Sequence, residues 1–205
     1  TSDAHPALPH RGMRITEAGR GITVASSSRC TFSRLDISSN SSAGIYAVNG
    51  GNHHITNCIV HGNGHGVHLL TSEDNTLQNN TIVGNTSSQL HLDHPANATS
   101  TVTVSNNIIW ADGAGSVAVH RHSLPFVLVS NHNDLYATDG AQVSNDGAAL
   151  SDWQAATGQD ANSISADPLF ADAANGAFQL QAGSPCIDAA DGDAAPEVDL
   201  LGYPR

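Results

Sequence analysis

Imidazole side chains that could act as general acids or bases are concentrated in the first half of this chain. Of the 12 His in 205 residues, nine lie before residue 111, and free imidazole titrates at about pH 6.5. We identify His68, His91 and His120 as candidate catalytic residues, with Asp93 as a carboxylate that orients or polarises a neighbouring imidazole. The candidate substrate-binding residues around them are Tyr46, His65, Arg121 and His122.

These residue types suit proton abstraction from a substrate that carries an acidic group. Removal of a carbon-bound proton next to a carboxylate requires a base near neutral pH and a cation beside that carboxylate. His and Tyr can supply the base, and Arg121 can hold a carboxylate or a sulfate. Hydrolysis is less favoured because it requires two carboxylates about 5–9.5 Å apart. Only Asp93 is clearly placed for it, with Glu73 and Asp74 in a following loop.

Two groups of residues are candidate metal ligands. His91, Asp93 and His120 could bind a transition metal such as Zn²⁺, although their spacing matches no tight sequence motif. Further along the chain, carboxylates around Gly192 form an oxygen-rich loop that could bind Ca²⁺, the alternative being a solvated acidic loop. The candidate calcium ligands are Asp188, Asp191 and Asp193.

A repeat of about 23 residues is the feature that would bring the distant imidazoles together. Residues 55–69 align with residues 78–92 at a constant offset of 23, so that His68 falls on His91, and Tyr46 takes the corresponding place one unit earlier. In the next unit the period stretches to 26–27 residues. Each unit holds short apolar stretches of period two, broken by Gly, Asn and Ser. A strand of three or four residues buries its apolar face only when it stacks on copies of itself.

The sequence therefore predicts an all-β fold, a right-handed parallel β-helix (solenoid) of about five coils. We expect an N-terminal extension over residues 1–14, coils over residues 15–136, and an irregular tail over residues 137–205 that covers the C-terminal end of the helix. Equal positions in stacked coils lie about 4.8 Å apart, so identical side chains form ladders. A candidate ladder at a turn consists of Asn57, Asn80, Asn106 and Asn131.

Alternation along the strands predicts which side chains point outward. If Val67 and Leu69 point into the core, His68 points out, and the same rule applies in the neighbouring coils. The first predicted outward column is Tyr46, His68, His91 and Ala118, and the second is Val48, Leu70, Asp93 and His120. The alternative interpretation is that these His only tolerate exposed ladder positions.

Charge and composition argue against several kinds of partner. The net charge is −12, from 19 acidic residues against seven Arg and no Lys, which disfavours nucleic acid and anionic lipid. No apolar run approaches the roughly 18 residues of a membrane span, and we find no signal peptide. Cys30, Cys58 and Cys186 are expected to be small buried hydrophobes. Trp110 and Trp153 could stack on sugar rings.

The units between Ile15 and Tyr136 resemble the short repeats of secreted bacterial right-handed β-helix proteins. Residues 166–170 and 183–188 resemble a C-terminal tail common in the same group. That group is rich in enzymes that act on polysaccharides: pectate- and alginate-type lyases, mannuronan C5-epimerases and polygalacturonase-like hydrolases. Residues 65–85 are similar to coils of the epimerases.

The resemblance implies a secreted or cell-surface bacterial protein that acts on an acidic polysaccharide by lyase- or epimerase-type removal of the C5 proton of a uronide. Ala43 stands where the epimerases carry a catalytic Asp, and the chain has no Lys for the base that some lyases use. A non-catalytic β-helix segment of a longer protein, either sugar-binding or structural, is therefore the alternative. Ca²⁺ is the cofactor suggested for the acidic loop, beside the transition metal considered for His91, Asp93 and His120, and the oligomeric state stays open.

Overall fold

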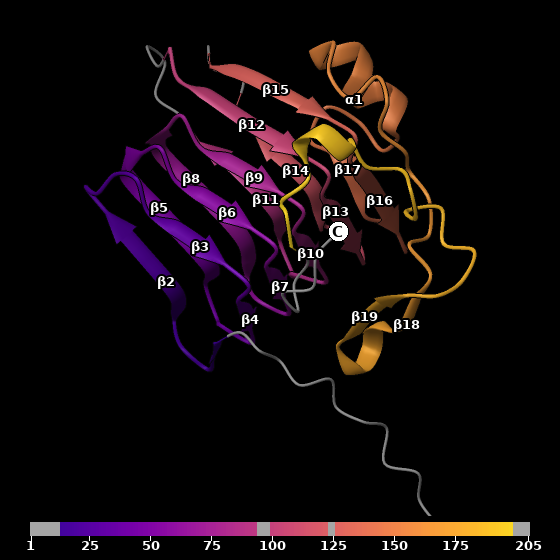
Figure 1. The fold of residues 1–205 in the computed structure, drawn as a ribbon, viewed down its shortest axis with the longest axis horizontal. Coiled ribbons are helices and arrows are strands. Elements are labelled where there is room, and N and C mark those ends of the chain that lie inside the picture. The colour runs from indigo at the N-terminus through magenta and orange to yellow at the C-terminus, as the bar shows by residue number, and fades with distance from the viewer. Residues whose placement is uncertain (1–12, 94–98, 123–125, 199–205) are drawn as a thin grey trace, which may run out of the picture.

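The computed structural model describes residues 13–93, 99–122 and 126–198. It is a right-handed parallel β-helix of about five coils, which confirms the predicted fold class (Figure 1). Most of the predicted N-terminal extension and the final residues 199–205 lie outside the described residues.

Successive coils contribute strands in turn to three parallel sheets within the described residues. Sheet A contains β1 (Arg14–Thr16), β4 (Asp36–Ser38), β7 (Ile59–His61), β10 (Thr81–Val83), β13 (Ile108–Asp112) and β16 (Asp134–Thr138). Sheet B contains β2 (Arg20–Ala25), β5 (Ala43–Gly51), β8 (His65–Glu73), β11 (Ser88–Asp93), β14 (Val117–Arg121) and β17 (Gln142–Ser144). Sheet C contains β3 (Thr31–Ser33), β6 (His54–Thr56), β9 (Thr76–Gln78), β12 (Thr101–Ser105) and β15 (Val127–Asn131).

Aliphatic side chains stacked in register form the core between these sheets. One inward position of sheet A is fully buried on consecutive strands, where the residues are Ile37, Val60, Ile82, Ile109 and Leu135. A side chain of this size stabilises the fold by about 1.5–3 kcal/mol when it is fully buried. The period-two pattern of the sequence therefore decides which face of each strand turns inward, and the opposite face is left for polar side chains.

A ladder of buried Asn lies at the turn between sheets C and A, but its predicted register is wrong. The observed ladder is Asn80, Asn107 and Asn133, in which each Nδ2 donates to the next Oδ1, at 3.0 and 3.1 Å. Asn57 and Asn106 occupy the preceding position, where the backbone is left-handed with φ of 53° and 59°. The doublets at residues 79–80 and 106–107 make these two positions indistinguishable in the sequence.

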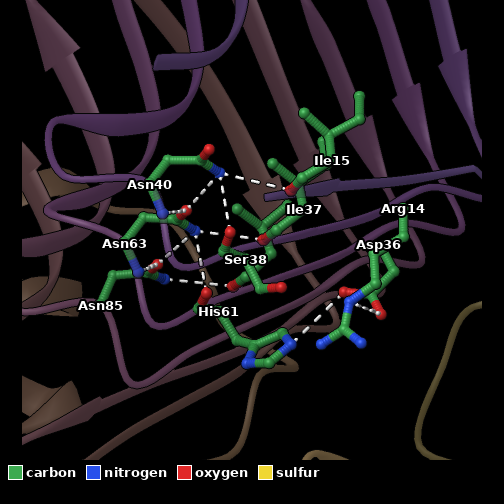
Figure 2. Close-up of polar contacts among 10 residues, drawn as sticks. Arg14, Ile15, Asp36, Ile37, Ser38, Asn40, His61, Asn63 and Asn85 are labelled. Atoms are coloured by element: carbon green, nitrogen blue, oxygen red, sulfur yellow. Dashed lines mark hydrogen bonds and ion pairs between the residues drawn. The ribbon is translucent and has the colours of Figure 1, made fainter. Parts of the chain in front are cut away.

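A second buried ladder, at the turn between sheets A and B, consists of Asn40, Asn63 and Asn85 (Figure 2). Asn63 Oδ1 accepts from both the backbone N–H and Nδ2 of Asn40, at 3.0 and 2.8 Å. The last amide, Asn85 Nδ2, donates to Gln89 Oε1 at 2.8 Å. The two ladders satisfy backbone groups that the turns would otherwise bury without partners.

Helix α1 (Leu150–Thr157) lies at the C-terminal end of the coils (Figure 1). Its Trp153 is 1% exposed and belongs to the hydrophobic core. Trp153 Nε1 donates to Asp160 Oδ2 at 2.8 Å, while Asp160 Oδ1 accepts from Asn133 Nδ2 at 3.0 Å. Asp160 therefore joins the end of the first Asn ladder to the residue that plugs the core, and Trp153 is not placed to stack on a sugar.

The coils extend beyond the predicted end at residue 136, because β17 adds the buried Val143 to the core. Beyond α1 the chain turns back along the side of the solenoid, where β18 (Phe170–Asp172) pairs antiparallel with β19 (Ala177–Leu180). The short helices are η1 (Ala173–Asn175) and η2 (Gly192–Ala194). The tail is thus not wholly irregular, and only its first part covers the end of the coils.

Aromatic contacts hold the returning tail against sheet A. The ring centroids of Trp110 and Phe170 lie 6.2 Å apart, and those of His61 and Phe178 lie 5.0 Å apart. Trp110 Nε1 also donates to Thr138 Oγ1 at 2.8 Å. Trp110 is therefore part of the packing beneath the tail. No helix in the described residues is long and apolar enough to cross a membrane.

Candidate functional site

A row of aromatic rings crosses the outward face of sheet B. The parallel register of β5, β8, β11 and β14 aligns Tyr46, His68, His91 and His120. The prediction placed Ala118 in this column and His120 in the next one. That placement is wrong because His120 follows His91 by 29 residues, two more than the 27-residue offset that the sequence suggested. The coil lengthens between β11 and β14, and the longer coil adds a fourth ring to the row.

The rings of the row are in contact. The centroids of His68 and His91 lie 4.3 Å apart, and those of His91 and His120 lie 4.5 Å apart and are stacked at 29°. Tyr46 meets His68 edge-on, at 5.1 Å. These separations match the strand spacing of about 4.8 Å, as expected for side chains at equal positions of successive coils.

At the start of the row, the backbones of neighbouring coils approach each other closely. Gly44 and Gly66 are the second residues of β5 and β8, the strands that carry Tyr46 and His68. A Cβ on Gly66 would lie 2.3 Å from the carbonyl oxygen of Gln89, which no side chain could tolerate. The Gly two residues before Tyr46 and the Gly two residues before His68 are therefore required by the stacking of the coils.

The remaining predicted residues surround the row. His65 lies 5.4 Å from His68 and 5.2 Å from His91 between ring centroids. The Ser88 hydroxyl bridges the Nδ1 atoms of His65 and His91, at 2.8 and 3.4 Å. His122 follows β14, and its Nε2 lies 3.9 Å from Asp93 Oδ1. The structure thus brings together the predicted imidazoles, Asp93 and Tyr46.

The imidazoles of the row are neutral at neutral pH. Burial, followed by the charge of the neighbouring His65, lowers the pKa of His68 to about 4. Burial also lowers the pKa of His91 to about 3, with His68 as the next cause. The pKa values of His65 and His120 are lowered by burial as well. Each of these side chains therefore offers an unprotonated ring nitrogen.

Two Arg lie at opposite ends of the row. The guanidinium of Arg20, on β2, lies 3.8 Å from the ring centroid of Tyr46, and no described carboxylate pairs with it. Arg121, the predicted carboxylate-binding residue, instead pairs with Asp146 at 2.8 Å and lies 5.6 Å from the Trp153 ring. Sequence reasoning missed Arg20, although extending the register one strand back from β5 places Arg20 beside Ala43.

The predicted calcium ligands are not brought together among the described residues. The carboxylate of Asp191 accepts from the backbone N–H of Asp193 at 3.1 Å and so caps η2. The backbone of Asp191 also pairs with the Asn106 side chain, at 2.8 and 2.9 Å. This acidic segment fixes the tail against the turn that contains Asn106.

Two cavities, of about 200 and 360 Å³, lie beneath the tail rather than on sheet B. The first is lined by Asp134 and Cys186, whose Sγ donates to Asp134 Oδ2 at 3.2 Å. Burial raises the pKa of Asp134 to about 6 and that of Cys186 to about 12. All three cysteines of the chain are free thiols, and Cys58 is the buried one.

Substitution Asp134→Asn is expected to stabilise the protein above pH 6 and to have little effect near pH 4. Between these values the folded carboxyl keeps a proton that the unfolded chain has lost, so wild-type stability falls as the pH rises. At pH 7.5 the variant gains roughly 2–3 kcal/mol in the free energy of unfolding. Urea unfolding at pH 4 and pH 7.5 measures this, and an equal difference at both pH values would contradict it.

Residues 11–155, well over half of the chain, match the family described as right handed beta helix region. No curated protein matches the chain. No solved structure matches it either. The match covers every residue of the aromatic row, but the family description names no reaction.

Proposed function

The chain belongs to the right-handed β-helix family, and we propose that it acts on an acidic polysaccharide by removing the C5 proton of a uronic acid residue. The observation that carries this proposal is the row of contacting rings on sheet B, which ends at an Arg without a described acidic partner. A base, a second proton-transferring group and a cation are thus within reach of one sugar residue.

Each group has a role in this reaction. Arg20 binds the uronate carboxylate, which lowers the free energy of the negative charge that develops when the C5–H bond breaks. His68 accepts the proton, because its ring lies between Tyr46 and His91 and is unprotonated at neutral pH. Tyr46 then supplies a proton from beside the base.

The intermediate can proceed in two ways. In elimination, the C4–O bond breaks, a C4=C5 double bond forms, and the leaving oxygen takes a proton from Tyr46. In epimerisation, solvent water gives a proton to C5 from the face that points away from the row, and the polymer stays intact. Both routes begin with the same proton transfer to His68.

Hydrolysis is disfavoured by the carboxylates near the row. Among the described residues, Asp93 lies beside the imidazoles, whereas Asp146 is paired with Arg121. Paired carboxylates across a glycosidic bond are needed for hydrolysis. A secreted or cell-surface location belongs to the same proposal, because acidic polysaccharides of this kind are found outside cells.

The test uses polygalacturonate, polymannuronate and polyguluronate as substrates. We expect wild-type protein to produce ultraviolet absorbance from the new double bond, or to change the ratio of C5 epimers, on at least one of them. His68→Ala should lower the rate by at least about 100-fold. His54→Ala is the matched control, since His54 is exposed on β6 of sheet C.

Binding of a polyuronide without either product would contradict the proposal and favour the non-catalytic β-helix. Full activity of His68→Ala would also contradict it, because the row would then be unnecessary for proton transfer.

A further inference from the structure

Ring nitrogens converge at the C-terminal end of the imidazole row. One ring nitrogen from each of His91, His120 and His122 lies within 4.8 Å of the others. We propose that these three residues form a binding site for one divalent first-row transition ion, with Zn²⁺ as the reference ion. The role of this ion in binding a sugar carboxylate rests on the proposed function, whereas the binding of the ion to the three imidazoles does not.

The donor set suits such an ion. Imidazole nitrogen binds Zn²⁺ at about 2.0–2.1 Å, which places two ligand atoms of a tetrahedral site about 3.3 Å apart. Side-chain rotation closes the remaining distance, since His122 is exposed and follows the end of β14. Its backbone N–H donates to the carbonyl of Leu92 at 3.1 Å, so the residue starts from a fixed position.

Polar groups next to the ligands orient them, as the hydrogen-bond partners of ligating imidazoles do in known metal sites. The Ser88 hydroxyl contacts Nδ1 of His91 at 3.4 Å, which orients that ring and leaves Nε2 for an ion. The carboxylate of Asp93 lies 3.9 Å from His122 Nε2 and adds negative charge beside the site. Three protein ligands leave a fourth position open, as in catalytic zinc sites.

The open position gives the ion a role in the proposed reaction. A uronate carboxylate bound there would meet a divalent charge one coil away from His68, at the opposite end of the row from Arg20. The ion would then select for acidic sugars by binding their carboxylates.

A competing trio shares one of these ligands. His68, His91 and Asp93 also bring ligand atoms within 4.8 Å of one another. We favour the three-imidazole set because imidazole suits Zn²⁺, Cu²⁺ and Ni²⁺, whereas carboxylate is also a good ligand for Mg²⁺ and Ca²⁺. Single substitutions distinguish the two trios, since His120 belongs to one of them and His68 to the other.

The experiment is calorimetric titration of ZnCl₂ into EDTA-treated, dialysed protein in the absence of polysaccharide. We expect one ion per chain, and Co²⁺ should give the visible absorbance of a tetrahedral site. His120→Ala should weaken Zn²⁺ binding by more than about 100-fold, exceeding the 10–100-fold cost of losing an outer partner. His68→Ala and His54→Ala should retain tight binding.

Wild-type protein that binds Zn²⁺ no more tightly than His120→Ala would overturn the inference. Loss of binding in His68→Ala with retention in His120→Ala would overturn it in favour of the competing trio. Thermal unfolding with and without Zn²⁺ is the second measurement, because an ion bound to the folded chain raises its melting temperature. An unchanged melting temperature of the wild type would also overturn it. Both measurements omit substrate, so they are independent of the proposed reaction.

Discussion

Replacement of Asn63 by alanine is expected to lower the free energy of unfolding by about 4 kcal/mol. Asn63 is 1% exposed and accepts two hydrogen bonds from Asn40 while donating to Asn85. It also donates to the carbonyls of Ile37 and His61, at 3.1 and 3.0 Å. Alanine leaves the buried backbone N–H of Asn40 without an acceptor, which costs about 1–3 kcal/mol, whereas the Asn40 Nδ2 keeps the carbonyl of Ser38. Loss of the other side-chain hydrogen bonds of Asn63, at about 0.5–1.5 kcal/mol each, accounts for the rest.

Equilibrium urea unfolding measures this loss as a shift of the midpoint at constant slope. Asn162→Ala is the matched control, because Asn162 is exposed and bonds to Asn131 through its backbone N–H rather than its side chain. We expect the control to change stability by less than about 0.5 kcal/mol. A loss below about 1 kcal/mol for Asn63→Ala would mean that the ladder does not stabilise the coils.

Replacement of Trp153 by alanine is expected to cost about 4 kcal/mol, and replacement by phenylalanine about 2 kcal/mol. Alanine opens a cavity at the end of the core, where Trp153 is 1% exposed. It also removes the N–H that bonds to Asp160, itself 1% exposed. Phenylalanine keeps an aromatic ring in the core and removes the N–H, so the pair of variants separates packing from hydrogen bonding.

Urea unfolding of both Trp153 variants tests whether α1 closes the solenoid. Equal losses for the two would show that the hydrogen bond to Asp160 accounts for the whole effect. Near-wild-type stability of Trp153→Ala would contradict the assignment of this residue as the plug of the core.

The fold could be predicted because the same pattern recurs along the chain. Residues 55–69 and 78–92 align without a gap, and this constant offset becomes the observed pairing of His68 with His91. Each coil repeats the same inward aliphatic positions, so an error in one coil does not change the fold class. The predicted row of His68, His91 and Tyr46 follows from that pairing.

The predicted register is wrong where the coils change length. The sequence does not show how many residues separate the ring positions of β11 and β14. The prediction used an offset of 27 residues, whereas in the structure His120 pairs with His91 at an offset of 29. Helix α1 was missed because it has eight residues with Trp153 as its buried one, which is too short for a periodic signal. The Arg20 contact was missed because β2 lacks the motif of the later coils.

The central claim is that the ring row on sheet B takes a proton from C5 of a polyuronide. NMR of the polymer incubated with the protein in D₂O measures this directly, because elimination and epimerisation both remove the C5 proton signal. We predict loss of that signal with the wild type and His54→Ala, and its retention with His68→Ala. Retention of the C5 proton in all three polyuronides at saturating wild-type protein would contradict the claim.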